Sequence, residues 1–275
     1  MDAESAKRYL LYWVAFDGAD FHGFQRQRDL RTVAGTIEAA WRQFQHETIV
    51  ARSSSRTDAG VHARLMPVLI ATDSDISLKG ARFGLDHLLP PDLAVVDVEE
   101  VDKSFHVRHD AIGKRYIYRV WSERPRDPTR RRDHWHVPWT LDHEAMGRGA
   151  QVLQGEHDFA AFRTSACTAQ STLRSLHRVE VLREGRAVSI VVEGNAFLHN
   201  MVRIIAGSLV EVGQGKRDAQ ALELALSSGV RADAGITAPA HGLTLERVMY
   251  GPYGAKQGLE HKAVLARLAA AATDG

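Results

Sequence analysis

The sequence predicts an α+β fold built from two ferredoxin-like halves. The chain has 275 residues, more than one average domain needs, so two modest domains or one large body are expected. Hydrophobic residues make up 44% and charged residues 25%, which is enough apolar material for a large buried core. Short apolar segments typical of strands are interspersed with segments whose apolar residues recur at helical spacing. Strands and helices in this mixed order favour an α+β architecture.

The first half contains four predicted strands and two predicted helices. Thr32 can cap the first helix, because its hydroxyl can accept a hydrogen bond from the backbone of the first turn. Pro67 argues that the third strand either starts there or lies at a sheet edge. In order, the expected elements are a strand Tyr9–Phe16, a helical stripe Val33–Phe44, strands Thr48–Ala51 and Leu65–Ala71, a helix Ile76–Leu88 and a strand Leu93–Val101. This order is that of a ferredoxin-like layer.

The second half has a similar mixture of elements without visible sequence repetition. We expect strands Lys114–Trp121 and Leu243–Tyr250, a hairpin of Leu176–Leu182 with Ala187–Gly194, an irregular loop Arg124–Trp139, and helices Asp142–Leu153, Met201–Val212 and Asp218–Ser227. We place the N-terminal half at residues 1–105 and the C-terminal half at 106–253. The remaining tail, 254–275, is Ala/Leu-rich, a helix-forming composition. Since no Gly/Ser linker separates the halves, a shared sheet or a tight interface is expected.

Charge and composition restrict the class of protein. Lys and Arg total 35 against 34 Asp and Glu, a net charge of +1 that excludes a histone-like basic protein. Nucleic-acid binding stays open, because phosphate contacts need a local basic face, not a basic total. The single cysteine, Cys167, fits a reducing cytoplasm. Neither a signal-peptide pattern nor an apolar run of about 20 residues is present, so we expect a cytoplasmic protein without a membrane span.

The segment Arg56-Thr-Asp58-Ala-Gly60-Val-His62 is the most informative for chemistry. An aspartate is an anion at neutral pH and can act as a nucleophile toward a sugar carbon or an activated base. The small residues after Asp58 let a planar ligand approach the backbone. Arg56 can keep the carboxylate ionised or bind a phosphate. The alternative is an ordinary surface turn in which Asp58 caps a helix.

Three further segments carry residues suited to RNA. Aromatic and basic residues alternate with glycines from Asp17 to Gln27, which suits stacking on bases, although the Phe side chains could instead fold into the core. On the predicted strand, Tyr116 offers a stacking face and a hydroxyl, or simply half of an aromatic pair with Tyr118. The loop with Arg124, Arg126, Arg130, Arg131 and Arg132 is either an RNA-facing patch or a solvated loop.

Arg203 lies inside the apolar run of a predicted helix. A buried arginine is costly unless an anion pairs with it, and Asp58 is a suitable partner. The alternative places Arg203 on the polar face of the helix.

We predict no metal and no nucleotide cofactor. The histidine pairs His134/His136 and His106/His109 lack a third ligand at metal-binding spacing, and no phosphate-binding loop pattern is present.

Taken in order along the chain, these segments resemble the tRNA pseudouridine synthase A family. The resemblance runs from about residue 9 to about residue 250. The matching segments are Phe16-Asp-Gly18, Gly23–Gln27, Arg56–His62, Ser104–Arg108, Lys114–Tyr116, Asp158–Arg163, Asn195–Arg203 and Ala238–Leu245.

The resemblance implies a pseudouridine-synthase-type fold, with two halves around a central cleft, usually as a homodimer. It also implies isomerisation of uridine to pseudouridine at positions 38 to 40 of the tRNA anticodon arm, without a cofactor. Asp58 matches the catalytic aspartate, and Tyr116 the tyrosine that stacks on the target uracil. Arg203 matches the arginine that pairs with the aspartate, and Arg56 would position the RNA strand or the aspartate.

Departures from the family pattern flank the site and leave these four residues in place. Arg64–Pro67 stands where the family usually has a Gly-rich stretch, and Ser55 where a glycine is common. They keep a second hypothesis open, an RNA-binding homologue with weak or no catalysis. A third, an Asp-dependent hydrolase, would need a water-activating base or a metal site that the sequence does not reveal.

Overall fold

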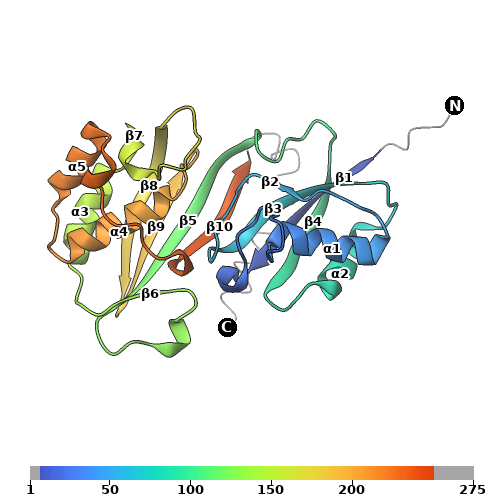
Figure 1. Ribbon diagram of the computed structural model, residues 1–275, viewed down its shortest axis with the longest axis horizontal. Helices are drawn as coiled ribbons and strands as arrows, with labels where there is room; N and C mark the ends of the chain where they lie inside the picture. Colours follow the sequence, from blue (N-terminus) through green and yellow to red (C-terminus); the bar gives the residue numbers. More distant parts are fainter. Residues whose placement is uncertain (1–6, 251–275) are drawn as a thin grey trace.

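The computed structural model describes residues 7–250, which form an α+β protein around one ten-stranded, mostly antiparallel sheet. The predicted fold class is therefore confirmed. The sheet order is β4-β1-β3-β10-β5-β9-β8-β7, with β2 beside β3 and β6 beside β5. Figure 1 shows α1 and α2 at one end of the molecule and α3, α4 and α5 at the other, with β5 and β10 running between them. The predicted tail, 254–275, lies outside the described residues.

The first half has a ferredoxin-like arrangement, with strand order β4-β1-β3-β2 and antiparallel neighbours. Its elements are β1 (Arg8–Phe16), α1 (Val33–Gln45), β2 (Arg52–Ser53), β3 (His62–Thr72), α2 (Leu78–Leu88) and β4 (Leu93–Val101). Thr32 caps α1 as predicted, since its side chain accepts a hydrogen bond from the Gly35 amide. The strand predicted at Thr48–Ala51 is wrong, because pairing occurs at Arg52–Ser53 instead.

Pro67 lies in the middle of β3, so its expected position at a strand start is wrong. On one side, β3 pairs with β1 along most of its length, with a register shift between Val14 and Phe16, and Pro67 lies opposite Trp13. On the other side, β3 pairs with β10 only at His62 and Ala63, and with β2 only at Val68 and Leu69. Pro67 falls in the gap between these two short pairings, a local edge where a strand tolerates proline.

The second half comprises β5 (Ala111–Ser122), β6 (Trp135–Val137), α3 (His143–Val152), β7 (Gly155–Asp158), β8 (Leu173–Glu184), β9 (Ala187–Gly194), α4 (Met201–Gly213), α5 (Ala219–Ser228) and β10 (Leu243–Tyr250). Its predicted helices and main strands are confirmed. The loop expected at Arg124–Trp139 contains β6, which pairs in parallel with β5. Strand β7 was not predicted.

Strand β10 ties the halves into one sheet. It pairs antiparallel with β5 of its own half and parallel with β3 of the other. Two large apolar clusters lie on either side of this seam, one under α1 and α2 and one under α3, α4 and α5. Tyr116 of β5 packs against both clusters, so it stands where the two cores meet. None of the helices between residues 7 and 250 is long and apolar enough to cross a membrane.

Candidate active site

Asp58 lies in a tight turn between β2 and β3. The amide of Val61 donates to the carbonyl of Asp58 at 3.2 Å, and Gly60 has φ +81°. A positive φ at the third residue of a four-residue turn favours glycine, which explains the Asp-Ala-Gly-Val order. The alternative that Asp58 caps a helix is wrong, because the turn leads into strand β3.

The loop before α1 is fastened to this turn. The Phe24 amide donates to the Thr57 carbonyl at 3.1 Å, and the Gly60 amide donates to the Phe21 carbonyl at 3.2 Å. A Cβ on Gly23 would stand 2.5 Å from the Thr57 carbonyl oxygen, so only glycine fits this close approach. Phe21 and Phe24 are both buried in the N-terminal core. The core alternative is thus confirmed for the two Phe side chains, while the backbone between them supports the Asp58 turn.

The Asp58 carboxylate meets side chains from the start of α4. Arg203 Nη1 lies 3.4 Å from Asp58 Oδ2, and His199 Nε2 lies 3.3 Å from Asp58 Oδ1. The Asp58 side chain is 27% exposed, and Arg203 is 18% exposed. The turn and α4 belong to different halves, so the carboxylate lies at the seam of the molecule. Arg203 therefore faces Asp58, not the polar side of its helix.

Arg203 is oriented by two other hydrogen bonds. Its Nε donates to the Ala238 carbonyl at 2.8 Å, and its Nη1 donates to Asn200 Oδ1 at 2.7 Å. Asn200 has φ +62° at the N-terminus of α4 and makes no side-chain cap there. A left-handed conformation is uncommon for a residue other than glycine, and asparagine tolerates it better than most. The Asn200 side chain instead accepts the hydrogen bond from Arg203.

Tyr116 forms a wall of the same site. Its ring packs edge-on against Phe197, with centroids 5.1 Å apart. Burial raises the pKa of Tyr116 to about 12, and the negative charge of Asp58 acts in the same direction. The hydroxyl therefore stays protonated at neutral pH and can donate a hydrogen bond.

Arg56 is the predicted site residue that the structure does not bring onto Asp58. Its side chain is exposed, and it has no hydrogen-bond or ion-pair partner among residues 7–250. The structure thus leaves its guanidinium available to an external anion.

His62, the last residue of the motif, ties the Asp58 turn to the other half. Its Nδ1 lies 3.0 Å from the Gly18 amide nitrogen, and its Nε2 lies within 3.0 Å of the Arg132 and His241 carbonyl oxygens. Arg132, from the arginine-rich loop, forms ion pairs with Asp17 at 2.6 Å and Asp20 at 2.8 Å. One arginine of that loop is therefore part of the seam.

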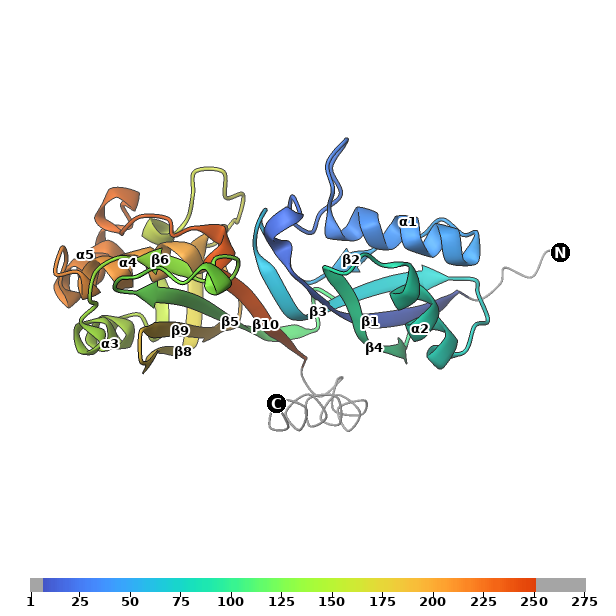
Figure 2. The ribbon, with the colours of Figure 1, turned by 90° about the horizontal axis from the view of Figure 1, so that it is seen from below.

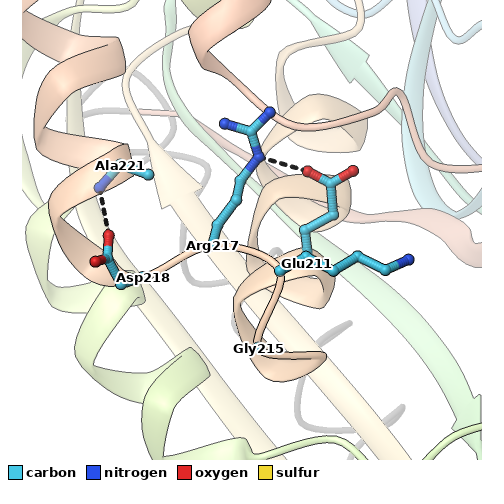
Figure 3. Close-up of a pocket in the computed structure, with 6 residues that line it drawn as sticks. Glu211, Gly215, Arg217, Asp218 and Ala221 are labelled. Carbon is cyan, nitrogen blue, oxygen red and sulfur yellow. Dashed lines mark hydrogen bonds and ion pairs between the residues drawn. The ribbon is translucent and has the colours of Figure 1, made fainter.

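Two surface hollows lie in the C-terminal half, away from Asp58. One is lined by Glu211, Gly215, Lys216, Arg217, Asp218 and Ala221, and Figure 3 shows the Arg217–Glu211 ion pair across it. Arg203 and Glu211 are eight residues apart on α4, about 12 Å along the helix axis. Each guanidinium nitrogen of Arg217 donates a hydrogen bond, to Glu211 and to the carbonyls of Asp233 and Ala234. The Arg217–Glu211 ion pair therefore stabilises this hollow, which is separate from the Asp58 site.

The segment Arg64–Pro67, which departs from the family pattern, does not contact the Asp58 carboxylate. It lies in β3, where Leu65 and Met66 are buried, and the exposed Arg64 approaches Glu246 at 3.9 Å. Among residues 7–250, no group of three His, Cys, Asp or Glu side chains stands at metal-binding geometry.

Comparison with known proteins decides the family. A family model described as tRNA pseudouridine synthase matches residues 13–110 and 150–251. The chain belongs to the tRNA pseudouridine synthase family. The tRNA pseudouridine synthase A of Geotalea daltonii is 44% identical over 86% of this chain and 97% of its own length. That of Myxococcus xanthus is 43% identical over 86% of this chain and 90% of its own.

Among solved structures, a chain of a Cbf5-Nop10-Gar1 complex matches 87% of this protein and 58% of that chain. Its identity is 14% and its TM-score 0.33, too low to carry an argument.

His199 and Asn200 are the site residues that sequence reasoning missed. Both lie in the segment Asn195–Arg203 that carries the tRNA pseudouridine synthase resemblance. Nothing in their local pattern distinguishes a ligand of Asp58 from the start of a helix. The signal that could have found them is the position of Arg203, because Asn200 precedes it by one helical turn.

Proposed function

We propose that this protein isomerises uridine to pseudouridine in tRNA, with Asp58 as the nucleophile. The supporting observation is the Asp58 carboxylate, which contacts Arg203 and His199 at its two oxygens, in a chain of this family. The relatives' name, tRNA pseudouridine synthase A, supports the substrate. We further propose positions 38 to 40 of the anticodon arm, a cytoplasmic location and a homodimer, as the family resemblance implies.

The chemistry needs an anionic carboxylate beside the sugar. The bond between uracil N1 and C1′ breaks, the base rotates, and a bond forms between C5 and C1′. The C5 proton then leaves to a base and N1 takes up a proton, so the atoms balance without a co-substrate. Asp58 either attacks C1′ or assists a glycal route by taking a proton from the sugar. Arg203 places a positively charged guanidinium 3.4 Å from this carboxylate.

Tyr116 is proposed to receive the flipped uracil. Extruding a base from its stack costs a few kcal/mol, and stacking on an aromatic ring returns roughly 1–3 kcal/mol. The ring is braced by Phe197, which favours a fixed stacking surface.

RNA contacts are proposed for Arg56 and for two loops. Figure 2 shows the loop before α1 and the loop before β8 projecting on the same side of the molecule. Both touch the site, the first through Thr57 and the second through a Thr164–His199 contact. The unpaired guanidinium of Arg56 suits a backbone phosphate between them.

The test is release of tritium from tRNA labelled at uridine C5, followed by mapping of the modified positions. We expect steady release by the wild type and a loss of at least about 10³-fold in Asp58→Asn. The matched control is Asp218→Asn, at the N-terminus of α5, where asparagine caps as well as aspartate and activity should be retained.

Tight tRNA binding without tritium release by the wild type would instead favour the catalytically weak RNA-binding homologue. Equal release by Asp58→Asn would remove Asp58 from the mechanism. Sedimentation of the full chain separates monomer from dimer.

A further inference from the structure

His199 contacts the oxygen of Asp58 that Arg203 leaves free. Its Nε2 lies 3.3 Å from Asp58 Oδ1, whereas Arg203 Nη1 lies 3.4 Å from Oδ2. A carboxylate oxygen only accepts hydrogen bonds, so the proton of this contact belongs to His199 Nε2. The imidazole is 43% exposed, so one side of it faces away from the protein.

A second contact orients the imidazole ring. Thr164 Oγ1 lies 3.2 Å from His199 Nδ1. The two residues also meet through their backbones, because the Thr164 amide donates to the His199 carbonyl at 3.4 Å. In the neutral ring with its proton on Nε2, Nδ1 accepts from the threonine hydroxyl. Both ring nitrogens then have a polar neighbour, and Nε2 is held on the side of the Asp58 carboxylate.

The backbone turn at the start of α4 delivers both contacts together. The Met201 amide donates to the Leu198 carbonyl at 3.1 Å, and Asn200 is left-handed between them. This turn places His199 before the helix and Arg203 one turn inside it. The two side chains therefore approach Asp58 from one rigid support, and a rigid support is what precise positioning requires.

We propose that His199, oriented by Thr164, is a positioning residue for Asp58 in the isomerisation. With Arg203 holding one oxygen and His199 the other, the carboxylate plane cannot rotate, and the attacking oxygen keeps one direction toward the sugar. Catalysis is sensitive to such orientation, because misplacement of a reacting group by about 1 Å costs about 100-fold in rate. This inference rests on the proposed function, since it assigns a role within the same reaction.

The test compares kcat and KM for tritium release across paired variants. His199→Ala is expected to lower kcat about 10- to 100-fold, the effect of losing one polar contact to a charged group, while KM changes less than about threefold. His199→Gln is expected to recover most of kcat, because its amide NH₂ can occupy the place of Nε2–H. Thr164→Val should lower kcat by a smaller factor, and Thr164→Ser should restore it.

Controls separate positioning from folding and from RNA binding. His143→Gln changes an exposed histidine at the start of α3 and should keep wild-type kcat. A rise in KM with an unchanged kcat would make His199 an RNA contact and overturn the proposal. Equal losses in His199→Ala and His199→Gln would reduce its role to bulk packing. Should His199→Ala fail to fold, Thr164→Val against Thr164→Ser still decides the question.

A readout independent of turnover separates this inference from the proposed function. Nitrogen-15 NMR of the full chain at pH 8 should show the His199 ring protonated on Nε2 in the wild type. The same signal should change in Asp58→Asn and in Thr164→Val, but not in His143→Gln. A ring protonated on Nδ1 would overturn the inference. An inactive wild type with the expected ring signals would overturn only the proposed function.

Discussion

Asp17 and Asp58 have the same kinds of partner and are held in different ways. Each belongs to the N-terminal half, and each meets an arginine of the C-terminal half and a histidine. Asp17 contacts Arg132 at 2.6 Å and His62 at 3.1 Å, and its side chain also accepts from the Ala19 amide at 3.0 Å. Asp58 contacts Arg203 at 3.4 Å and His199 at 3.3 Å, without an amide donor among the described residues.

The two histidines, His62 beside Asp17 and His199 beside Asp58, also differ in their burial and in their number of contacts. His62 is buried, and its second nitrogen is within 3.0 Å of two backbone carbonyls. His199 is 43% exposed, and its second nitrogen meets a single hydroxyl. Asp17 therefore has the shorter and more numerous contacts at the junction between the halves, although its side chain is 33% exposed against 27% for Asp58. Asp58 is held by longer and fewer contacts, which leave carboxylate lone pairs for the substrate in the proposed reaction.

Similar residues thus stand at a structural junction around Asp17 and in the proposed active site around Asp58. Short, saturated contacts hold the two halves in register. Longer contacts from a rigid helix start orient a carboxylate without using up its lone pairs.

Arg203→Lys should lower kcat about 100-fold, or about 2.7 kcal/mol in activation free energy. Lysine keeps the charge but lacks the planar fork that reaches Asp58, Asn200 and the Ala238 carbonyl together. The measurement is single-turnover tritium release. Arg132→Lys is the matched control at the Asp17 junction, and its folded fraction should react within about threefold of the wild type. Similar kcat losses in both variants would show that Arg203 and Arg132 do not differ in role.

Asp17→Asn should lower stability by about 1 kcal/mol at pH 7, since the partly exposed carboxylate is screened by solvent, while kcat changes little. Burial alone would raise the pKa of Asp17, but hydrogen bonds from the Ala19 amide and Arg132, with the charges of His62 and Arg132, lower it below its ordinary value. A lowered pKa gives stability that is present above pH 4 and is lost as pH falls through the folded-state value.

Denaturant unfolding of the wild type and Asp17→Asn should therefore give curves that differ at pH 7 and converge below pH 4. A difference that is constant with pH, or a large fall in kcat with unchanged stability, would mean that Asp17 is not a structural junction.

Lys114 offers a smaller test of how the Asp58 loop is anchored. Its Nζ donates to the Ser54 carbonyl at 2.7 Å from β5, and burial lowers its pKa to about 8, with the charge of Arg108 adding to the effect. Between pH 8 and the unfolded value of about 10.4, the unfolded chain binds more protons, so this group's contribution to stability rises with pH. The gain should be about 1–2 kcal/mol between pH 8 and 9.5.

Lys114→Met should lack that rise, whatever its overall stability. Unfolding free energies of both proteins, measured at intervals from pH 8 to 9.5, give the two slopes. Parallel curves would show that Lys114 is not titrating in this range and that its ammonium is better solvated than its burial indicates.

Most regular elements follow from the sequence alone. The stripe from Val33 to Phe44 buries one face of α1, and Thr32 starts that helix through its own hydroxyl. The strand Leu93–Val101 has the predicted bounds, because alternation and flanking prolines are local signals. The motif around Asp58 also predicted a turn at the correct place, because Gly60 is the residue that adopts a positive φ there.

Other features were decided only when distant segments met. Strands β2, β6 and β7 have two to four residues, too few for an alternation pattern, and exist because a longer neighbour offers backbone partners. Pro67 is tolerated inside β3 because β10 and β2 leave a gap beside it. The contacts of His199 and Arg203 with Asp58 join opposite halves. Local sequence sets which backbone shapes are favourable, but contacts across the seam depend on how β10 joins the two halves into one sheet.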